Sequence, residues 1–572
     1  MPGNWFHAKS IRRSLAIALC LGSRIFAAAQ IAGTAHPSHP APPSSTYIGN
    51  QACAGCHASI YESYQRTPMA HASGPATEDL QPASFVHAKS GVHYRIYSED
   101  GKVWLSFERP GDPSVNGKRE LLYFIGSGHR GRTYLFSVDG FFFESPINWY
   151  AGRKVWDMAP AYSEAREIPM NLPAYTSCLE CHTTGMQSPI KGTENEYPTP
   201  LFTQDGVGCE RCHGPGAEHA QTAAGTKGAP MLNPIKLPAD RRDSICMQCH
   251  LEANVAIGRL GRHASDFRPG DILDDYVRHY VLTGSQTSGV GANSQFEALA
   301  RSACKKKSGD AMSCMSCHDP HSSPLAAERA SYFREKCLAC HGAAFGAKHH
   351  RENLDCTSCH MPSSLSTDIA HTEVTDHRIP RRPSTQPQLL QDFSPEKSSP
   401  TLIPFPYSKE ADDDVRDRAL AWQSVAENGM PEAVREAARL LPLAAKQSPD
   451  DPAVLSGLAY VELTHGSIGH ARELYQKALA LDPTLIDAAS NLGVIEAKSG
   501  NLRRAIALWQ DAFNRAPGKS SIGMNLARSF CESGQTKEAR LYVEKVLRFN
   551  PDLLEAKKML QHLSVDPPSC AP

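Results

Sequence analysis

Two hydrophobic patterns of different period divide the chain. In residues 84–150, apolar and polar side chains alternate in short runs, such as residues 93–97 and 102–107, on either side of an Asp-Gly turn. An alternation of period two is typical of β-strands with one buried face. We therefore predict a small β insertion here. Beyond residue 412 the composition changes to Ala, Leu, Glu and Arg, which is typical of helices.

A 34-residue period runs through this helical part. The residues that keep the period are Pro449, Pro483, Pro517 and Pro551, with Ala437, Ala471, Ala505 and Ala539, and the bulky Leu441, Tyr475, Trp509 and Val543. Small residues where two helices cross, bulky residues between the helices and a closing proline resemble the tetratricopeptide repeat. The resemblance implies an α-α superhelix over residues 413–565, with a degenerate first repeat at 415–449. A proline-rich linker at 384–412 precedes it.

Cysteine and histidine form seven Cys-x-x-Cys-His motifs, all between residues 47 and 383. They are, as motifs 1 to 7, Cys53/Cys56/His57, Cys178/Cys181/His182, Cys209/Cys212/His213, Cys246/Cys249/His250, Cys314/Cys317/His318, Cys337/Cys340/His341 and Cys356/Cys359/His360. In this motif two thiols add to the vinyl groups of a haem, and the adjacent histidine reaches the iron. We predict seven covalently bound haem c groups, with the motif histidines as proximal ligands.

Structural zinc is the main alternative, because zinc sites also use Cys-x-x-Cys pairs. Histidine makes up 25 of the 572 residues, so chance would place it after roughly one pair in 23, whereas it follows all seven. Redox dithiols would need a thioredoxin-like βαβ pattern, which is not visible. We therefore predict a mainly α fold, with a loop-rich heptahaem cytochrome c domain at 47–383 whose core consists largely of haem.

Each iron can take a second axial ligand, and twelve histidines of this region lie outside the motifs. His219 and His321 are favoured, because each follows a motif by a few residues and can reach a neighbouring haem. Near motif 1, Met69 competes with His71, and a methionine ligand would raise the potential of that haem. The further distal candidates are His129, His349, His350, His371 and His377.

The motif run resembles the multihaem cytochromes c related to the tetrahaem carrier of ammonia oxidisers, hydroxylamine oxidoreductase and pentahaem nitrite reductase. The segment Cys209–His219 carries much of this resemblance, and Cys314–His321 also resembles a motif of electron-conduit cytochromes. The resemblance covers about residues 47–380 and implies stacked haems that pass electrons. No motif has the lysine that marks the catalytic haem of pentahaem nitrite reductases. We identify no counterpart of the cross-linked tyrosine of hydroxylamine oxidoreductase.

Two functions remain open, and the first is favoured. In that reading the protein is an electron carrier whose repeats dock redox partner proteins, with a membrane quinol-oxidising complex as one candidate partner. In the alternative it is a periplasmic reductase or oxidase of a small nitrogen or sulfur compound, such as nitrite, hydroxylamine or tetrathionate. An enzyme would need one haem without a distal side chain, so catalytic residues stay unknown. The net charge of −1 shows no basic excess, which argues against a nucleic-acid partner.

Residues 1–29 predict a signal peptide. Lys9, Arg12 and Arg13 precede an apolar run, and Ala27–Ala29 form a small-residue cleavage site. Residues 30–46 then form a flexible leader, and we expect a periplasmic or otherwise extracytoplasmic protein. An uncleaved N-terminus that anchors the chain to a membrane is the alternative.

Outside the motifs, Cys304 is either a lone buried thiol or a thiolate stabilised by the lysines that follow it.

Overall fold

The computed structural model describes residues 46–570 apart from several segments. These segments are residues 169, 224–229, 284–292, 350–354, 367–372, 383–399, 407–413, 428–429 and 566–569. The predicted signal peptide, nearly all of the leader and most of the linker therefore lie outside the described residues. The chain forms two compact units, which we describe separately. The haem unit comprises Ala32–Arg166 and Leu172–Lys409, and the repeat unit comprises Glu410–Pro572 with Glu167–Asn171.

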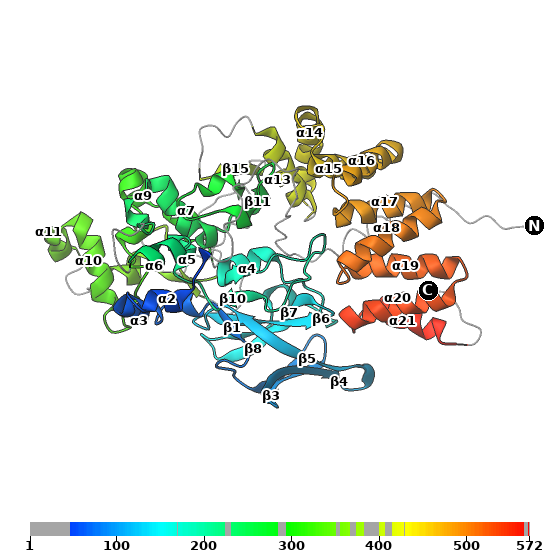
Figure 1. The fold of residues 1–572 in the computed structure, drawn as a ribbon, viewed down its shortest axis with the longest axis horizontal. Coiled ribbons are helices and arrows are strands. Elements are labelled where there is room, and N and C mark those ends of the chain that lie inside the picture. The colour runs from blue at the N-terminus through cyan, green and yellow to red at the C-terminus, as the bar shows by residue number, and fades with distance from the viewer. Residues whose placement is uncertain are drawn as a thin grey trace, which may run out of the picture. The chain divides into compact units, whose positions relative to one another are not determined.

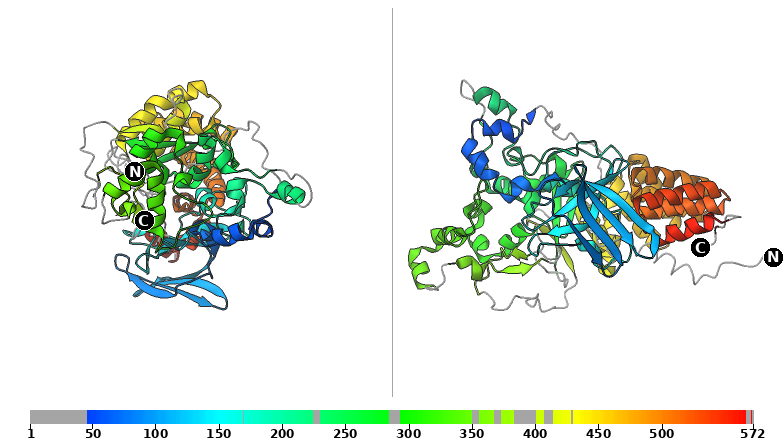
Figure 2. Two further views of the ribbon diagram at one scale, coloured as in Figure 1. Left: turned by 90° about the vertical axis from the view of Figure 1, so that its left-hand side faces the viewer. Right: turned by 90° about the horizontal axis from the view of Figure 1, so that it is seen from below.

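An antiparallel sheet of eight strands dominates the first part of the haem unit (Figure 1). The strands are β1 (Ser73–Pro75), β2 (Ala83–His87), β3 (Val92–Glu99), β4 (Lys102–Arg109), β5 (Asp112–Ile125), β6 (Gly131–Val138), β7 (Phe141–Tyr150) and β8 (Val155–Met158). Strands β2 to β8 pair in chain order, and β1 pairs with β5. Near the two ends of this order, Trp156 Nε1 donates a 2.8 Å hydrogen bond to the carbonyl oxygen of Gln81. The sheet thus curls until its outer strands approach each other, as Figure 2 shows for the blue and cyan strands.

The alternation in the sequence explains the first hairpin of this sheet. Val92, Tyr94 and Ile96 of β3 are buried, whereas the side chains between them are exposed, as expected for a strand with one covered face. Asp100 and Gly101 connect β3 to β4 with φ values of 52° and 73°. Asp-Gly suits this two-residue turn, because both positions require positive φ.

The predicted small insertion at 84–150 was wrong in its extent. The sheet runs from Ser73 to Met158 and makes the first part of this unit largely β rather than loop-rich. The sequence pattern missed β1 because a three-residue strand has no readable period. The pairings of β5 with both of its neighbours, β4 and β6, contain register shifts, which interrupt a regular alternation.

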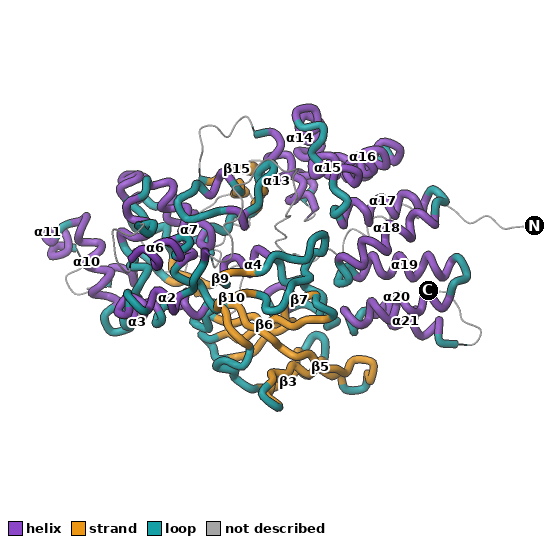
Figure 3. Tube along the Cα trace, viewed as in Figure 1, coloured by secondary structure: helices purple, strands orange, loops and turns teal. Residues whose placement is uncertain are grey.

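The rest of the haem unit consists of short helices and three small sheets (Figure 3). The helices are α2 (Asn50–Ala54), α3 (Ala58–Tyr64), α4 (Thr176–His182), α5 (Glu210–His213), α6 (Ala217–Ala223), α7 (Ala239–His250), α8 (Gln295–Arg301), α9 (Ala303–Ser308), α10 (Arg329–His341), α11 (Ala343–Lys348) and α12 (Cys356–His360). The sheets pair β9 (Thr184–Met186) with β10 (Phe202–Gln204), β12 (Val277–Thr283) with β11 (Val255–Gly258) and β15 (Thr401–Phe405), and β13 (Ser363–Leu365) with β14 (Glu373–Thr375). The motif histidine is the last residue of α4, α5, α7, α10 and α12. Each of these helices therefore ends at a haem motif.

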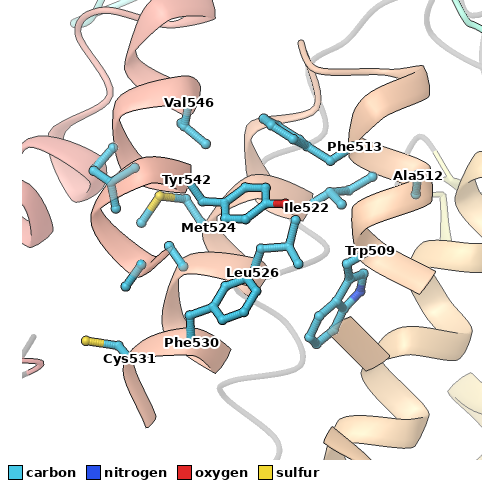
Figure 4. Packing of buried hydrophobic residues seen from close by; sticks show 14 of the residues in the cluster. Trp509, Ala512, Phe513, Ile522, Met524, Leu526, Phe530, Cys531, Tyr542 and Val546 are labelled. Carbon is cyan, nitrogen blue, oxygen red and sulfur yellow. The ribbon is translucent and has the colours of Figure 1, made fainter. Parts of the chain in front are cut away.

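The repeat unit contains four antiparallel helix pairs and a final helix. They are α13 (Val415–Glu427), α14 (Pro431–Gln447), α15 (Pro452–Thr464), α16 (Ile468–Leu481), α17 (Ile486–Lys498), α18 (Leu502–Arg515), α19 (Ser520–Glu532), α20 (Thr536–Phe549) and α21 (Leu554–Leu563). The repeating alanines and bulky residues predicted from the 34-residue period are all buried. Figure 4 shows Trp509 beside Leu526 and Phe530 in this core. A disulfide joins Cys531 of α19 to Cys570.

Helix lengths bear on membrane attachment. Within the part of the chain that the structure describes, none of the helices combines the length and the apolar character needed to cross a bilayer. The predicted N-terminal apolar run lies outside that part.

Candidate haem-attachment sites

The motif spacing equals one helical turn, which brings its reactive atoms together. In motifs 1, 3 and 5, the backbone N–H of the histidine donates to the backbone carbonyl oxygen of the first cysteine, at 2.9, 3.0 and 2.9 Å. This i to i+4 bond places the histidine on the same face as that cysteine, one turn later. Two thiols and one imidazole can therefore approach a single porphyrin from one side.

The cysteines are available for this chemistry. All fourteen motif cysteines are free thiols. Among the described residues, we find no cluster of three or more His, Cys, Asp or Glu side chains that could hold a metal ion by itself.

Most of the motif cysteines are half-buried, whereas Cys56 and Cys340 are exposed. The Sγ of Cys359 lies 3.9 Å from Ser358 Oγ. In motif 3, burial raises the pKa of the Cys212 thiol to about 11. Haem attachment at all seven motifs stays a prediction.

Four motif histidines have a second histidine ring opposite them. The ring centroids are 6.4 Å apart for His57 and His219, 5.9 Å for His213 and His321, 6.2 Å for His318 and His377, and 5.8 Å for His360 and His349. The ring planes are inclined by 13°, 13°, 26° and 30° in the same order. With metal–nitrogen bonds of about 2 Å and a ring centre about 1 Å beyond the nitrogen, two axial imidazoles on one iron lie about 6 Å apart. The four pairs therefore fit haem iron between their rings.

Hydrogen bonds orient several of these rings. Nδ1 lies 2.7 Å from the carbonyl oxygen of Leu232 in His213, and 2.9 Å from that of Pro380 in His360. In His377, Nδ1 lies 2.9 Å from the carbonyl oxygen of Thr375. A carbonyl can only accept, so Nδ1 carries the proton and the lone pair of Nε2 is free for a metal.

The sequence did not predict these carbonyl partners, because a backbone acceptor leaves no residue-type signal. His250 shows that a side chain can take the same place, since its Nδ1 lies 3.1 Å from Gln295 Oε1. A glutamine close to a motif in sequence could have been noticed, but Gln295 is on a different helix. The partner could therefore be found only from the tertiary structure.

Burial keeps the central imidazoles neutral, which is the form that binds metals. Desolvation lowers the pKa of His182, His213, His250 and His377, and it lowers the pKa of His318 to about 4. These rings are therefore available as ligands throughout the neutral range.

Three further distal candidates, His71, Met69 and His129, lie in the part of the chain that the structure describes. His71 has Nε2 2.6 Å from the carbonyl oxygen of Gln65, which occupies that nitrogen. Met69 is half-buried in the same turn, Pro68–His71, and His129 is exposed in the loop between β5 and β6. His350 and His371 lie outside the described residues.

Three motif histidines have no histidine ring opposite them among the described residues. They are His182, His250 and His341. His341 instead has the Phe345 ring 5.1 Å away. The haem sites thus fall into two classes, one with two histidines and one with a single described histidine.

Thiols of different motifs lie close enough for one to shift the pKa of the other. The pairs are Cys53 with Cys209, Cys181 with Cys249, Cys246 with Cys314, and Cys337 with Cys356. Motif 1 is therefore beside motif 3, motif 2 beside motif 4, motif 4 beside motif 5, and motif 6 beside motif 7. Haems attached at these positions would be close neighbours.

Cys304 on α9 is half-buried and forms no disulfide. Of the lysines that follow it, Lys305 donates to Asp243 Oδ2 at 3.2 Å and to the carbonyl oxygen of Met312 at 2.6 Å. That ammonium group is therefore engaged by partners other than the thiol.

Comparisons with known proteins give separate matches in the haem unit and in the repeat unit. The family "Cytochrome c554 and c-prime" matches residues 153–214, which contain motifs 2 and 3, and the family "Tetratricopeptide repeat" matches residues 432–486. The multiheme cytochrome MtrA of Shewanella baltica (strain OS185) is 26% identical over 191 residues, which are 30% of this chain and 54% of MtrA. The chain thus matches about half the length of this curated relative.

Solved structures similar to this chain cover about a quarter of its length. MamA 41-end from Desulfovibrio magneticus RS-1 is 18% identical, with a TM-score of 0.24, over 26% of this chain and 86% of that one. Pseudomonas aeruginosa pilF is 23% identical, with a TM-score of 0.24, over 26% of this chain and 68% of that one. The two family matches and the curated relative make the chain similar to multihaem c-type cytochromes and, at residues 432–486, to tetratricopeptide-repeat proteins.

Proposed function

We propose that this protein is an exported c-type cytochrome that carries seven haems and relays electrons between redox partners. The observation that supports this most is the exchange of histidines between motifs. His219 follows motif 3 but faces motif 1, and His321 follows motif 5 but faces motif 3. His377 follows motif 7 and faces motif 5, while His349 follows motif 6 and faces motif 7.

This exchange implies an order of haems. If each facing pair holds one iron, every such haem is held by segments that belong to two motifs. Haems 1, 3, 5, 7 and 6 are then neighbours in that order, and the thiol contacts of motifs 1 with 3 and 6 with 7 agree with it. The haem groups supply reversible one-electron transfer when bound. At the four facing pairs, the motif histidine and the histidine opposite it would hold the iron together, which would leave no open position there for a substrate.

The repeat unit suits protein docking. Stacked helix pairs form an extended surface for a partner, as in other repeat proteins. We propose that redox partners bind here, with a membrane quinol-oxidising complex among the candidates, so that tethering raises the effective concentration at the haems. Deleting residues 413–572 should leave the haem spectrum intact and weaken association with the partner. Loss of haem incorporation would contradict independent roles for the two units.

An oxidising compartment agrees with this function. The Cys531–Cys570 disulfide is of a kind that persists outside the cytoplasm. We propose export through the signal peptide at residues 1–29 and a periplasmic or otherwise extracytoplasmic location. N-terminal sequencing of the purified protein tests this, since a mature chain should begin near Gln30.

A second candidate function is favoured by one observation. Motifs 2 and 4 lie beside each other through Cys181 and Cys249, and neither His182 nor His250 has a described histidine opposite it. A haem with one axial ligand could bind a small substrate. We therefore retain reduction or oxidation of a small nitrogen or sulfur compound at this pair of motifs as the alternative.

Three measurements separate these proposals. Intact-mass analysis should show seven haem increments, and fewer after full maturation would reject at least one motif. Low-temperature EPR of the oxidised protein should show mainly low-spin haem. Rapid multi-turnover reoxidation of the reduced protein by nitrite, hydroxylamine, tetrathionate or sulfite, together with a high-spin signal, would contradict the pure carrier and support the enzyme.

A further inference from the structure

A buried carboxylate inside motif 3 binds backbone groups from two distant segments. Glu210, the residue after Cys209, is 4% exposed. Its Oε2 accepts from Gly49 N at 2.9 Å, and its Oε1 accepts from Gly216 N at 2.8 Å. Ile48 N donates to both carboxylate oxygens, at 3.1 and 3.2 Å. One side chain thus satisfies three backbone donors.

These donors lie immediately before two haem-binding elements. Ile48 and Gly49 precede α2, which carries the first cysteine of motif 1. Gly216 precedes α6, which carries His219, the histidine that faces His57. Glu210 is therefore the side chain through which motif 3 holds both the start of motif 1 and the segment that brings His219 to it.

The backbone conformation of Gly49 and the close packing at Gly216 favour this contact of Glu210 with both segments. Gly49 has a φ of 78° as it presents its N–H to Glu210, a conformation that suits glycine. At Gly216, an added Cβ would lie 3.2 Å from Ile48 Cδ1 and 3.3 Å from Glu210 Oε1. The two segments are thus packed closely around the carboxylate, with no space for a larger residue without displacement.

Neighbouring contacts join the same two regions. Asn50 Oδ1 accepts from Cys209 N at 2.8 Å, and Asn50 N donates to Gln204 Oε1 at 3.1 Å. Tyr64 at the end of α3 donates to the carbonyl oxygen of Val207 at 2.5 Å. The motif 1 segment is therefore fixed to the chain around motif 3 along its length, and Glu210 also binds Gly216, directly before α6.

We propose that Glu210 is a positioning residue that holds His219 opposite His57 and keeps haem 1 six-coordinate. This proposal rests on the ligand pair proposed above. Burying the Glu210 carboxylate costs desolvation free energy. Its hydrogen bonds from backbone N–H groups offset that cost and hold the two segments in place. Loss of the carboxylate frees the start of α6, which carries His219, because Gly216 N then has no acceptor from motif 3.

The test uses the full haem-loaded chain with the substitutions E210A, E210Q and H219A, and E218Q as a matched control. Glu218 is exposed on α6, one residue before His219. Low-temperature EPR of the oxidised proteins measures the high-spin signal, and intact mass checks that all haems are attached. We expect H219A to produce one haem equivalent of high-spin signal, E210A to approach that amount, and E210Q to fall between E210A and wild type. An amide keeps one acceptor but places an N–H₂ group against the remaining donors.

The double variant H219A/E210A should add no further high-spin signal, since both changes act on the same iron. E218Q should match wild type. If H219A changes the spin state but E210A does not, the positioning role of Glu210 is wrong. If H219A itself leaves the spin state unchanged, the axial pair is wrong, and the ligand set of the proposed function fails with it.

Discussion

His318 and His377 face each other with their ring centroids 6.2 Å apart, although one belongs to motif 5 and the other follows motif 7. Both rings are neutral, because burial lowers the pKa of each. Nδ1 of His377 lies 2.9 Å from the carbonyl oxygen of Thr375, so the lone pair of Nε2 is free for a metal. This pair combines the spacing and the protonation that an axial ligand set requires.

The first prediction concerns this pair. His377→Ala should convert one haem from low spin to high spin, because the iron opposite His318 loses its second imidazole. Low-temperature EPR of the oxidised protein measures the change. His93→Ala is the matched control, since His93 is exposed on β3 and far in sequence from any motif. An unchanged spectrum for His377→Ala would show that His377 is not a ligand.

The second prediction concerns pH and His279 on β12. Burial lowers the pKa of His279 to about 4. In the unfolded chain a histidine titrates near 6.5, so between pH 6.5 and 4 the unfolded state binds the extra proton. Stability therefore falls as pH decreases through this window, by about 2 kcal/mol between pH 7 and 5 from this group alone.

Denaturant unfolding of wild type and His279→Leu at pH 7 and pH 5 tests this. The leucine variant should lose about 2 kcal/mol less between the two values, because it has no proton to bind. His93→Leu should retain the wild-type difference. Equal pH dependence of wild type and His279→Leu would contradict a buried neutral His279.

The third prediction concerns the disulfide of the repeat unit. Cys570→Ser should lower the free energy of unfolding of this unit by about 3–4 kcal/mol, because the bridge closes a loop of sequence separation 39 and restricts the unfolded chain. The helical circular dichroism signal during denaturant unfolding measures it. Cys304→Ser, which removes a thiol outside any bridge, should leave this transition in place. A Cys570→Ser protein as stable as wild type would mean that the bridge contributes nothing.

The fourth prediction concerns the core of the repeats. Trp509 is 3% exposed, donates from Nε1 to the carbonyl oxygen of Ser490 at 3.0 Å, and lies over Gly493. Trp509→Ala should destabilise the repeat unit by about 3–5 kcal/mol, because it leaves a cavity and an unpaired carbonyl. Leu541→Ala on α20 is the control, since Leu541 is 49% exposed and surface changes cost about 0.5 kcal/mol or less. The haem absorption spectrum should not change in either variant.

The repeats were predictable because their contacts are local. Ala437, Ala471, Ala505 and Ala539 are all fully buried, as their 34-residue spacing predicted. Each helix pair packs mainly on its neighbours, so one period of the sequence specifies one unit of structure. The haem motifs were readable for a similar reason, since a single helical turn places their thiols and imidazole.

The surroundings of the motif thiols were not predictable in the same way. Cys56 and Cys340 are exposed, whereas the other motif cysteines are half-buried. The same Cys-x-x-Cys-His sequence therefore occurs in different surroundings. The difference depends on which other segments of the fold cover each motif, and the motif sequence does not specify those segments.

The β-sheet was predictable only in part. Strands β3 and β4 alternate buried with more exposed side chains and were recognised. Strand β1 was not, because Ser73–Pro75 is too short to show a period and is stabilised by pairing with Tyr123 to Ile125 of β5. Glu210 was missed as well, because a glutamate between two motif cysteines gives no sign of the backbone groups that it binds.

By itself, the sequence determined where the haem motifs lie, which histidine belongs to each motif, and how the repeats are built. These features depend on residues within one helical turn or one repeat. The tertiary structure decided which second histidine faces which motif, for example His219 with His57 rather than with motif 3 beside it. That choice depends on packing between segments such as Ile48–Gly49 and Glu210. Local spacing cannot specify it, because every spare histidine has the same ligand chemistry and only the fold determines which one lies about 6 Å from a motif ring.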